Sequence, residues 1–201
     1  LNDRHDYDEN YAHTPIETGL DPLLAKWGIA IPDDVLVIDS SCVTMNVPRK
    51  SPRGGMQAVE FRYFYYPLLL PGLQCFSEKH PVTKSLQGLL NFWASPIDLL
   101  PDRPVGVQVE NLIQSSAMAI RTKEVTDVRP DEELDKRIFA KAVTRQGSPQ
   151  RLVVALVGKF PSLFAGKSIP APSQSQPANT AKGKADDRAR TVLTDSAETR
   201  V

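Results

Sequence analysis

The sequence lacks an apolar run long enough to cross a bilayer. Its longest runs, Leu68 to Leu70 and Leu152 to Val157, are far shorter than the roughly 18 to 20 residues that a membrane-spanning helix needs. No signal-peptide pattern opens the chain, and its first residue is Leu1 rather than Met. We therefore expect an excised piece of a longer protein, without its targeting segments.

Cysteine and net charge are also scarce. The two cysteines, Cys42 and Cys75, are compatible with two thiols or with one disulfide, so they set no redox compartment. The 24 basic and 24 acidic side chains cancel, which argues against a strongly basic nucleic-acid binder. Neither of the glycine-rich motifs that bind nucleotide phosphates occurs. We therefore expect no nucleic acid partner and no cofactor.

Proline, by contrast, is abundant, with 17 residues in a chain of 201. Some prolines stand where secondary-structure elements are expected to end, such as Pro67, Pro81 and Pro96. Others cluster between residues 170 and 177, next to a stretch with almost no large apolar side chain. Such a segment cannot bury enough surface to offset the entropy of ordering it. We therefore expect a folded domain over residues 1–167 and a flexible linker over 168–201.

Apolar spacing within the expected domain predicts strands that alternate with helices. The continuous runs at residues 35–39 and 152–157 are typical of strands covered on both faces, as in an α/β sheet. A helix is expected after Thr18, ending at Gly28 in a left-handed C-cap. Further strands are expected at 61–66, 89–94 and 105–109, and helices from Thr83 or Ser85 and over 131–142. Residues 40–60 are basic and rich in proline and glycine, which predicts a long mobile loop.

Two constellations raise the question of chemistry. Cys42 follows an expected buried strand, and His80 could lie near it, as in an enzyme with a nucleophilic cysteine. The sequence around Cys42 lacks the glycines of a nucleophile elbow, so a structural role for this cysteine is the alternative. The acidic, histidine-containing segment near the N-terminus has ligand types for a metal but no zinc or calcium spacing, so we expect no metal site.

Several phrases of the sequence resemble, in order, those of one known family. They are Leu23-Leu24-Ala25-Lys26-Trp27-Gly28-Ile29, Leu36-Val37-Ile38-Asp39 with Cys42, Tyr65-Tyr66-Pro67-Leu68, His80-Pro81-Val82-Thr83, Ser95-Pro96-Ile97-Asp98, Leu112-Ile113-Gln114-Ser115-Ser116, and Val154-Ala155-Leu156-Val157-Gly158-Lys159-Phe160-Pro161-Ser162-Leu163-Phe164. This order is similar to that of the gliding-motility-type auxiliary component of ABC transporters. The resemblance covers roughly residues 20 to 170.

The resemblance implies a fold, a location and partners. The fold would be α/β, a layered Rossmann-like or flavodoxin-like domain with a mostly parallel sheet and an irregular C-terminal arm. The domain would lie on the periplasmic, extracytoplasmic face of the inner membrane, anchored by segments outside this sequence. Its partners would be the ABC permease and ATPase subunits of the same system. The family supplies no catalytic residues to assign here.

A binding surface is expected where the ends of these elements meet, since crevices form at such ends in open α/β sheets. Its candidate residues are Tyr65, Tyr66, His80, Ser95, Asp98, Ser115 and Ser116. The function we predict is therefore a non-enzymatic accessory domain that binds a protein or a ligand. The alternatives are a cysteine-dependent enzyme of glutamine-amidotransferase-like fold using Cys42 and His80, and a sugar- or peptide-binding module using exposed Tyr63 or Tyr65.

Overall fold

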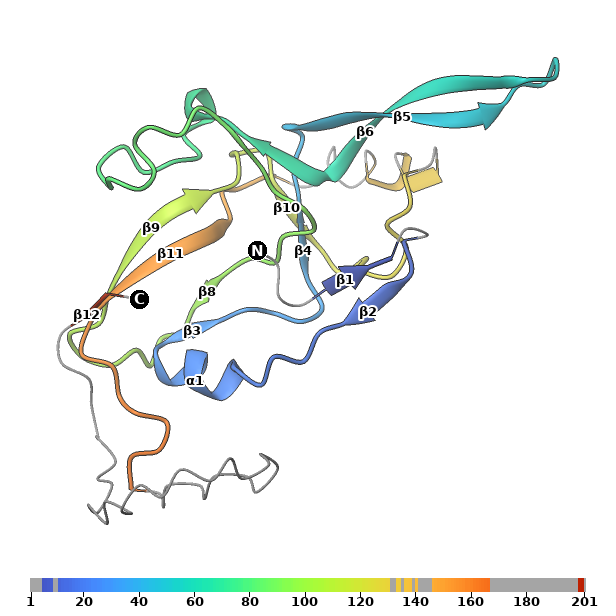
Figure 1. Ribbon diagram of the computed structural model, residues 1–201. Coiled ribbons are helices and arrows are strands. Elements are labelled where there is room, and N and C mark those ends of the chain that lie inside the picture. The colour runs from blue at the N-terminus through green and yellow to red at the C-terminus, as the bar shows by residue number, and fades with distance from the viewer. Residues whose placement is uncertain are drawn as a thin grey trace, which may run out of the picture.

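The computed structural model describes residues 5–8, 11–130, 133–134, 136–138, 140, 146–166 and 199–200. Every strand pair in this part of the chain is antiparallel. The prediction of a mostly parallel, Rossmann-like or flavodoxin-like α/β sheet is therefore wrong. Parallel neighbours need crossover connections of a dozen or more residues, which are usually helices. Here the chain returns through hairpins and long irregular segments instead (Figure 1).

The strands form several small sheets. The first contains β1 (His5–Tyr7) and β2 (His13–Pro15), the second β4 (Leu36–Ile38) and β10 (Ile120–Thr122), and the third β3 (Ile29–Ala30) and β8 (Asp98–Leu99). The longest strands are in two three-stranded sheets: β5 (Cys42–Lys50), β6 (Met56–Leu69) and β7 (Leu89–Leu90), and β9 (Gln108–Gln114), β11 (Arg151–Gly158) and β12 (Thr199–Arg200). A helix α1 (Asp21–Lys26) and a short 3-10 helix at Pro71–Leu73 complete the named elements.

The strand β4 shows why the sequence pattern misled the fold prediction. Its residues Leu36, Val37 and Ile38 are almost fully buried, as the apolar run indicates. Both edges of β4 are occupied, because β10 pairs with one edge while the amide of Val37 donates to the carbonyl of Ala94. Aromatic residues of β6 and the apolar residues Leu134 and Ile138 pack on it. Burial on two faces therefore reflects a central position in a mixed core, not a layer of crossover helices.

The segment 40–60 is also different from the prediction. Instead of a long loop, β5 and β6 pair from Val43↔Tyr63 to Lys50↔Met56, and only residues 51–55 form the turn. Alternation explains this pairing, because Val43, Met45 and Val47 share one face of β5. The basic residues and prolines of this segment obscure the two-residue alternation of apolar side chains that is typical of a strand. The resulting hairpin extends beyond the rest of the described chain (Figure 1).

Other predicted elements have mixed outcomes. The helix α1 is present and Gly28 follows it at φ 85°, although Leu20 and not Thr18 is the N-cap residue. The expected helix after Thr83 or Ser85 is replaced by turns. The described residues of the 131–142 stretch are helical. The predicted linker 168–201 lies outside the described residues except for Thr199–Arg200, which pair with β11.

Candidate functional site

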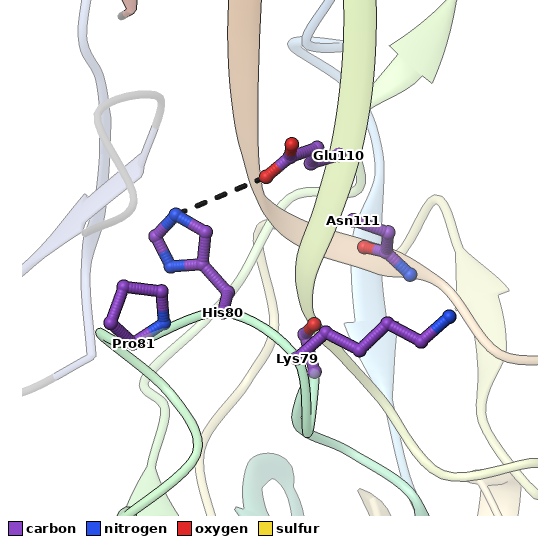
Figure 2. Close-up of a pocket in the computed structure, with 6 residues that line it drawn as sticks. Lys79, His80, Pro81, Glu110 and Asn111 are labelled. Carbon is purple, nitrogen blue, oxygen red and sulfur yellow. Dashed lines mark ion pairs between the residues drawn. The ribbon is translucent and has the colours of Figure 1, made fainter.

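A pocket of about 370 Å³ lies between the segment 77–81 and the strand β9. It is lined by Ser77, Lys79, His80, Pro81, Glu110 and Asn111. The imidazole Nε2 of His80 lies 3.9 Å from a carboxylate oxygen of Glu110, and the Lys79 side chain points away from this pair (Figure 2). The pocket therefore presents basic and acidic side chains and both hydrogen-bond donors and acceptors to solvent, as a binding site for a polar group would.

The local sequence places His80 by hydrogen bonds within the 77–83 turn. The hydroxyl of Thr83, which is buried, donates to the carbonyl of Ser77 at 2.7 Å. The amide of Val82 donates to Nδ1 of His80 at 3.3 Å. With Nδ1 engaged by this bond, Nε2 faces Glu110. The turn thus fixes one orientation of the imidazole at the edge of β9.

A second pocket of about 110 Å³ adjoins the first and shares Ser77 and Asn111 with it. Cys75 lines this smaller pocket, but its side chain is almost fully buried. Burial raises the pKa of the Cys75 thiol above its ordinary value, so the thiol stays protonated and is a poor nucleophile. The two pockets form one polar region along β9.

The cysteine-enzyme hypothesis finds no support in this arrangement. Cys42 does not line the pocket that contains His80; it opens β5 opposite Pro67 and packs beside the core. Both cysteines are thiols and are not joined to each other. Among the described residues, no group of three or more histidine, cysteine, aspartate or glutamate side chains could hold a metal ion.

The three predicted serines are buried. Ser116 donates from its hydroxyl to a carboxylate oxygen of Asp39 at 2.6 Å and from its amide to the other oxygen at 2.8 Å. Asp39 is 1 % exposed, and the amide of Ser41 also donates to it. Ser115 and Ser95 are buried as well. Ser115 and Ser116 therefore lie inside the protein, where Ser116 contacts Asp39 just after the end of β4.

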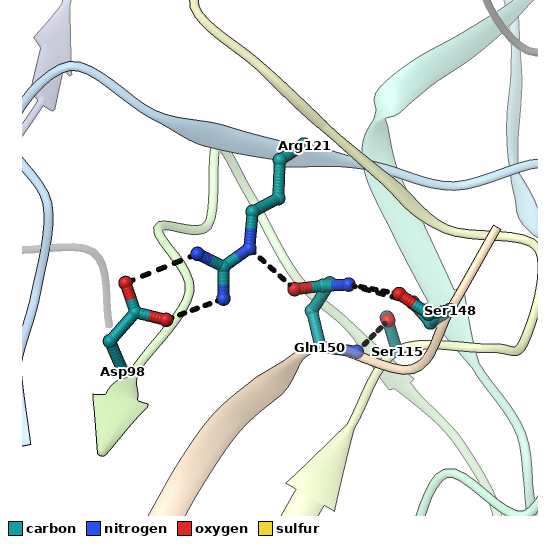
Figure 3. A network of polar contacts seen from close by, with 5 residues as sticks. All are labelled: Asp98, Ser115, Arg121, Ser148 and Gln150. Atoms are coloured by element: carbon teal, nitrogen blue, oxygen red, sulfur yellow. Dashed lines mark hydrogen bonds and ion pairs between the residues drawn. The ribbon is translucent and has the colours of Figure 1, made fainter. Parts of the chain in front are cut away.

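Asp98 and Ser115 meet in a second polar network, which spans β8, β10 and the start of β11 (Figure 3). The guanidinium of Arg121 donates two bonds to the Asp98 carboxylate, at 2.6 and 3.1 Å, and a third to the side-chain oxygen of Gln150 at 2.6 Å. Gln150 donates to Ser148 from its side chain and to the hydroxyl of Ser115 from its backbone. These contacts use the Arg121 fork to join three strands that no ladder connects.

The two predicted tyrosines lie in an aromatic core. Tyr65 is fully buried and its hydroxyl donates to the carbonyl of Glu124, whereas Tyr66 is half-buried against Phe92 and Trp93. Tyr63 is 1 % exposed, so the aromatic strand does not present Tyr63 or Tyr65 to a sugar or peptide. Burial raises the pKa of both hydroxyls above the ordinary range.

Of the predicted site residues, His80 lines the open pocket. The others lie in the buried core or in the network around Arg121. The shared surface that the sequence suggested stays a prediction. Sequence reasoning missed Glu110 and Asn111, which β9 places beside His80, and Arg121 and Gln150 in the network. Single polar residues on a strand form no recognisable sequence motif, so the sequence did not mark them as site residues. The burial pattern of β9 does not alternate regularly, since the adjacent residues Leu112 and Ile113 are both buried. The sequence therefore offered no signal for the segment packed beside Glu110 and Asn111.

Comparison with known proteins places the chain in a family. A family model described as an ABC-type uncharacterized transport system matches residues 2–198. No curated protein and no solved structure matches the chain. In the part of the chain that the structure describes, no helix has the length and apolarity needed to cross a membrane.

Proposed function

Because the chain belongs to this family of auxiliary components of ABC-type transport systems, we propose that it is a non-enzymatic accessory domain that works by binding. The observation that carries the proposal is the family match itself, since it covers nearly the whole chain. The proposed partners are the permease and the ATPase of the same system. The motif order quoted above supports a system of the gliding-motility type and a position on the extracytoplasmic face of the membrane.

The pocket at His80 supports binding as the mode of action. It is open to solvent and combines the imidazole of His80, the carboxylate of Glu110 and the amide of Asn111 on two different segments. Such a set matches a polar group that both donates and accepts hydrogen bonds, on a ligand or on a partner protein. Of the other polar clusters described above, the one between Asp39 and Ser116 is buried, and the partly exposed pair of Arg121 and Asp98 joins neighbouring strands.

Co-purification tests the proposed association. The full-length protein that contains this chain is tagged, solubilised from its own membrane and purified, and the permease and ATPase are quantified in the eluate. We expect both subunits at a fixed ratio to the bait. A tagged integral membrane protein of an unrelated transporter serves as the control. Recovery of neither subunit above this control would refute the proposed association.

Protease accessibility tests the proposed location. A protease added to spheroplasts should digest this domain while the ATPase subunit stays intact, because only groups outside the cytoplasm are reached. After the membrane is permeabilised, both should be digested. Protection of the domain in intact spheroplasts would place it on the cytoplasmic side and contradict the proposal.

A further inference from the structure

The larger of the two pockets lies where the chain separates from β9. The bridge Phe76↔Ile113 joins the chain to β9, and the amide of Ser77 donates to the carbonyl of Leu112 at 2.9 Å. The Ser77 carbonyl accepts the hydroxyl of buried Thr83 at 2.7 Å, which directs the chain away from β9. On its other edge, β9 is held by its ladder with β11. Both walls of the pocket are therefore fixed by hydrogen bonds, as in a preformed binding site.

The pocket presents a cation and an anion from different segments. Lys79 and Glu110 both line it, and the Lys79 side chain points away from the pair of His80 and Glu110 (Figure 2). Lys79 forms no ion pair with any residue that the structure describes. Nε2 of His80 lies 3.9 Å from Glu110, beyond hydrogen-bond distance, so the carboxylate keeps its capacity to accept hydrogen bonds from a ligand. Both charges are therefore available to one bound molecule.

Asn111 adds a fixed acceptor beside the anion. Its side-chain nitrogen donates to the side-chain oxygen of Gln114 at 2.7 Å, and the Gln114 nitrogen donates to the carbonyl of Gln74 at 3.0 Å. These bonds orient the Asn111 amide and leave its oxygen to accept a bond from a ligand. Glu110 and Asn111 line the pocket from β9, whereas Lys79 lines it from the other segment. The pocket therefore has acceptors on one wall and a cation on the other.

The size of the pocket and the placement of its charges select a class of ligand. Small-molecule pockets enclose about 300 to 1,000 Å³, so a pocket of about 370 Å³ suits a small molecule. A simple anion would face the like charge of Glu110, and a simple cation would face that of Lys79. A neutral polyol would remove water from both charges without supplying an opposite charge to either. A zwitterion, with an ammonium group for one wall and a carboxylate for the other, satisfies both.

We propose that this pocket binds a free amino acid, with its ammonium group against Glu110 and Asn111 and its carboxylate against Lys79. This inference rests on the proposed function, because binding is the mode of action proposed there, and it names the ligand class of the same pocket. The bound molecule bridges β9 and the segment 77–81, so each wall contributes a charge-assisted hydrogen bond to its affinity.

Isothermal titration calorimetry tests the ligand class, with the full-length protein that contains this chain and each proteinogenic amino acid in turn as the probe. We expect saturable binding of at least one amino acid. The tightest ligand is then compared with its amide, which lacks the carboxylate, and with its N-acetyl derivative, which lacks the ammonium group. Each derivative should bind about tenfold more weakly, since it loses one charge-assisted hydrogen bond. If no amino acid binds, or if both derivatives bind equally well, the inference is wrong.

Two single substitutions test the assigned walls. Lys79→Gln and Glu110→Gln each remove one charge and keep a side chain of similar length, and each should weaken amino-acid binding about tenfold. The matched controls are Lys159→Gln and Glu60→Gln, at exposed positions outside the pocket, which should bind like the wild type. Urea unfolding curves establish that every variant is folded. If the pocket variants bind like the wild type, or if the controls weaken binding as much, the pocket is not the site.

The remaining outcomes distinguish the two proposals. If the permease and the ATPase co-purify with the protein but no amino acid binds, the inference fails while the proposed association stands. If an amino acid binds and the Lys79→Gln variant loses it, the inference stands even where neither subunit co-purifies. Glucose is the probe for a neutral ligand. Glucose binding that the Glu110→Gln variant loses, with no binding of any amino acid, would overturn the assigned ligand class.

Discussion

Tyrosine hydroxyls hold the segment after β10 to the core, and removing one of them tests this reading of the aromatic strand. Tyr63 donates to the backbone carbonyl of Val128, and its oxygen accepts a bond from Nε1 of Trp93 at 3.1 Å. Tyr65 and Tyr7 donate in the same way, to the carbonyls of Glu124 and Val125. The substitution Tyr63→Phe removes one oxygen and keeps the ring.

The size of the effect follows from burial. Tyr63 is 1 % exposed and Val128 is fully buried, so water does not replace the lost donor at the Val128 carbonyl. Leaving one buried acceptor without its partner and losing the second bond predicts a loss of about 2 to 3 kcal/mol in the free energy of unfolding. For a chain of this size, each kcal/mol shifts Tm by about 2 to 4 °C. The expected decrease in Tm is therefore roughly 4 to 12 °C.

Urea and thermal unfolding followed by tryptophan fluorescence measure this change, since Trp93 contacts the Tyr63 hydroxyl. The matched control is Tyr66→Phe. Tyr66 is on the same strand, and its hydroxyl has no hydrogen-bond partner among the described residues. We expect the Tyr66→Phe variant to stay within about 0.5 kcal/mol of the wild type. Equal effects of the two substitutions would refute the assigned role of the Tyr63 hydroxyl.

Three further outcomes are expected. Asp39→Asn places an amide donor against the N–H and O–H groups that donate hydrogen bonds to the buried carboxylate. The free energy of unfolding, measured with urea, should fall by about 2 to 4 kcal/mol. A change below about 0.5 kcal/mol would contradict the described bonds. Burial raises the pKa of buried tyrosines such as Tyr65 in the folded protein, so their stabilisation is complete below the unfolded pKa of about 10 and falls as pH rises further. The urea midpoint should therefore decrease between about pH 9 and 11, with no tyrosinate absorbance before unfolding, and early ionisation in the folded state would exclude this cause. Gly158→Ala sets a Cβ 2.6 Å from the carbonyl oxygen of Gly106 at φ 151°, and should lower Tm, whereas Gly72→Ala, with open space around it, should not.

The sequence predicted local features well where one signal decides them. The run at β4 is a buried strand, and Gly28 takes a left-handed conformation after α1, because continuous apolar residues and a glycine after a helix act over short distances. The basic hairpin was missed, since its prolines and cations obscure an alternation that is present in Val43, Met45 and Val47. Family membership was also visible in the sequence, from the order of short phrases.

The sequence alone therefore indicated the buried strand β4, the helix α1 and membership of a family of ABC-transport auxiliary components. Only the tertiary structure decided strand direction, because the same apolar run is buried in parallel and in antiparallel sheets, and the partners of β4 come from residues 94 and 120–122. It also decided which polar residues face solvent. Ser116 and Asp39 satisfy each other inside the core, whereas His80 meets Glu110 at a pocket. Such pairings join residues far apart in the chain, and no local pattern encodes them.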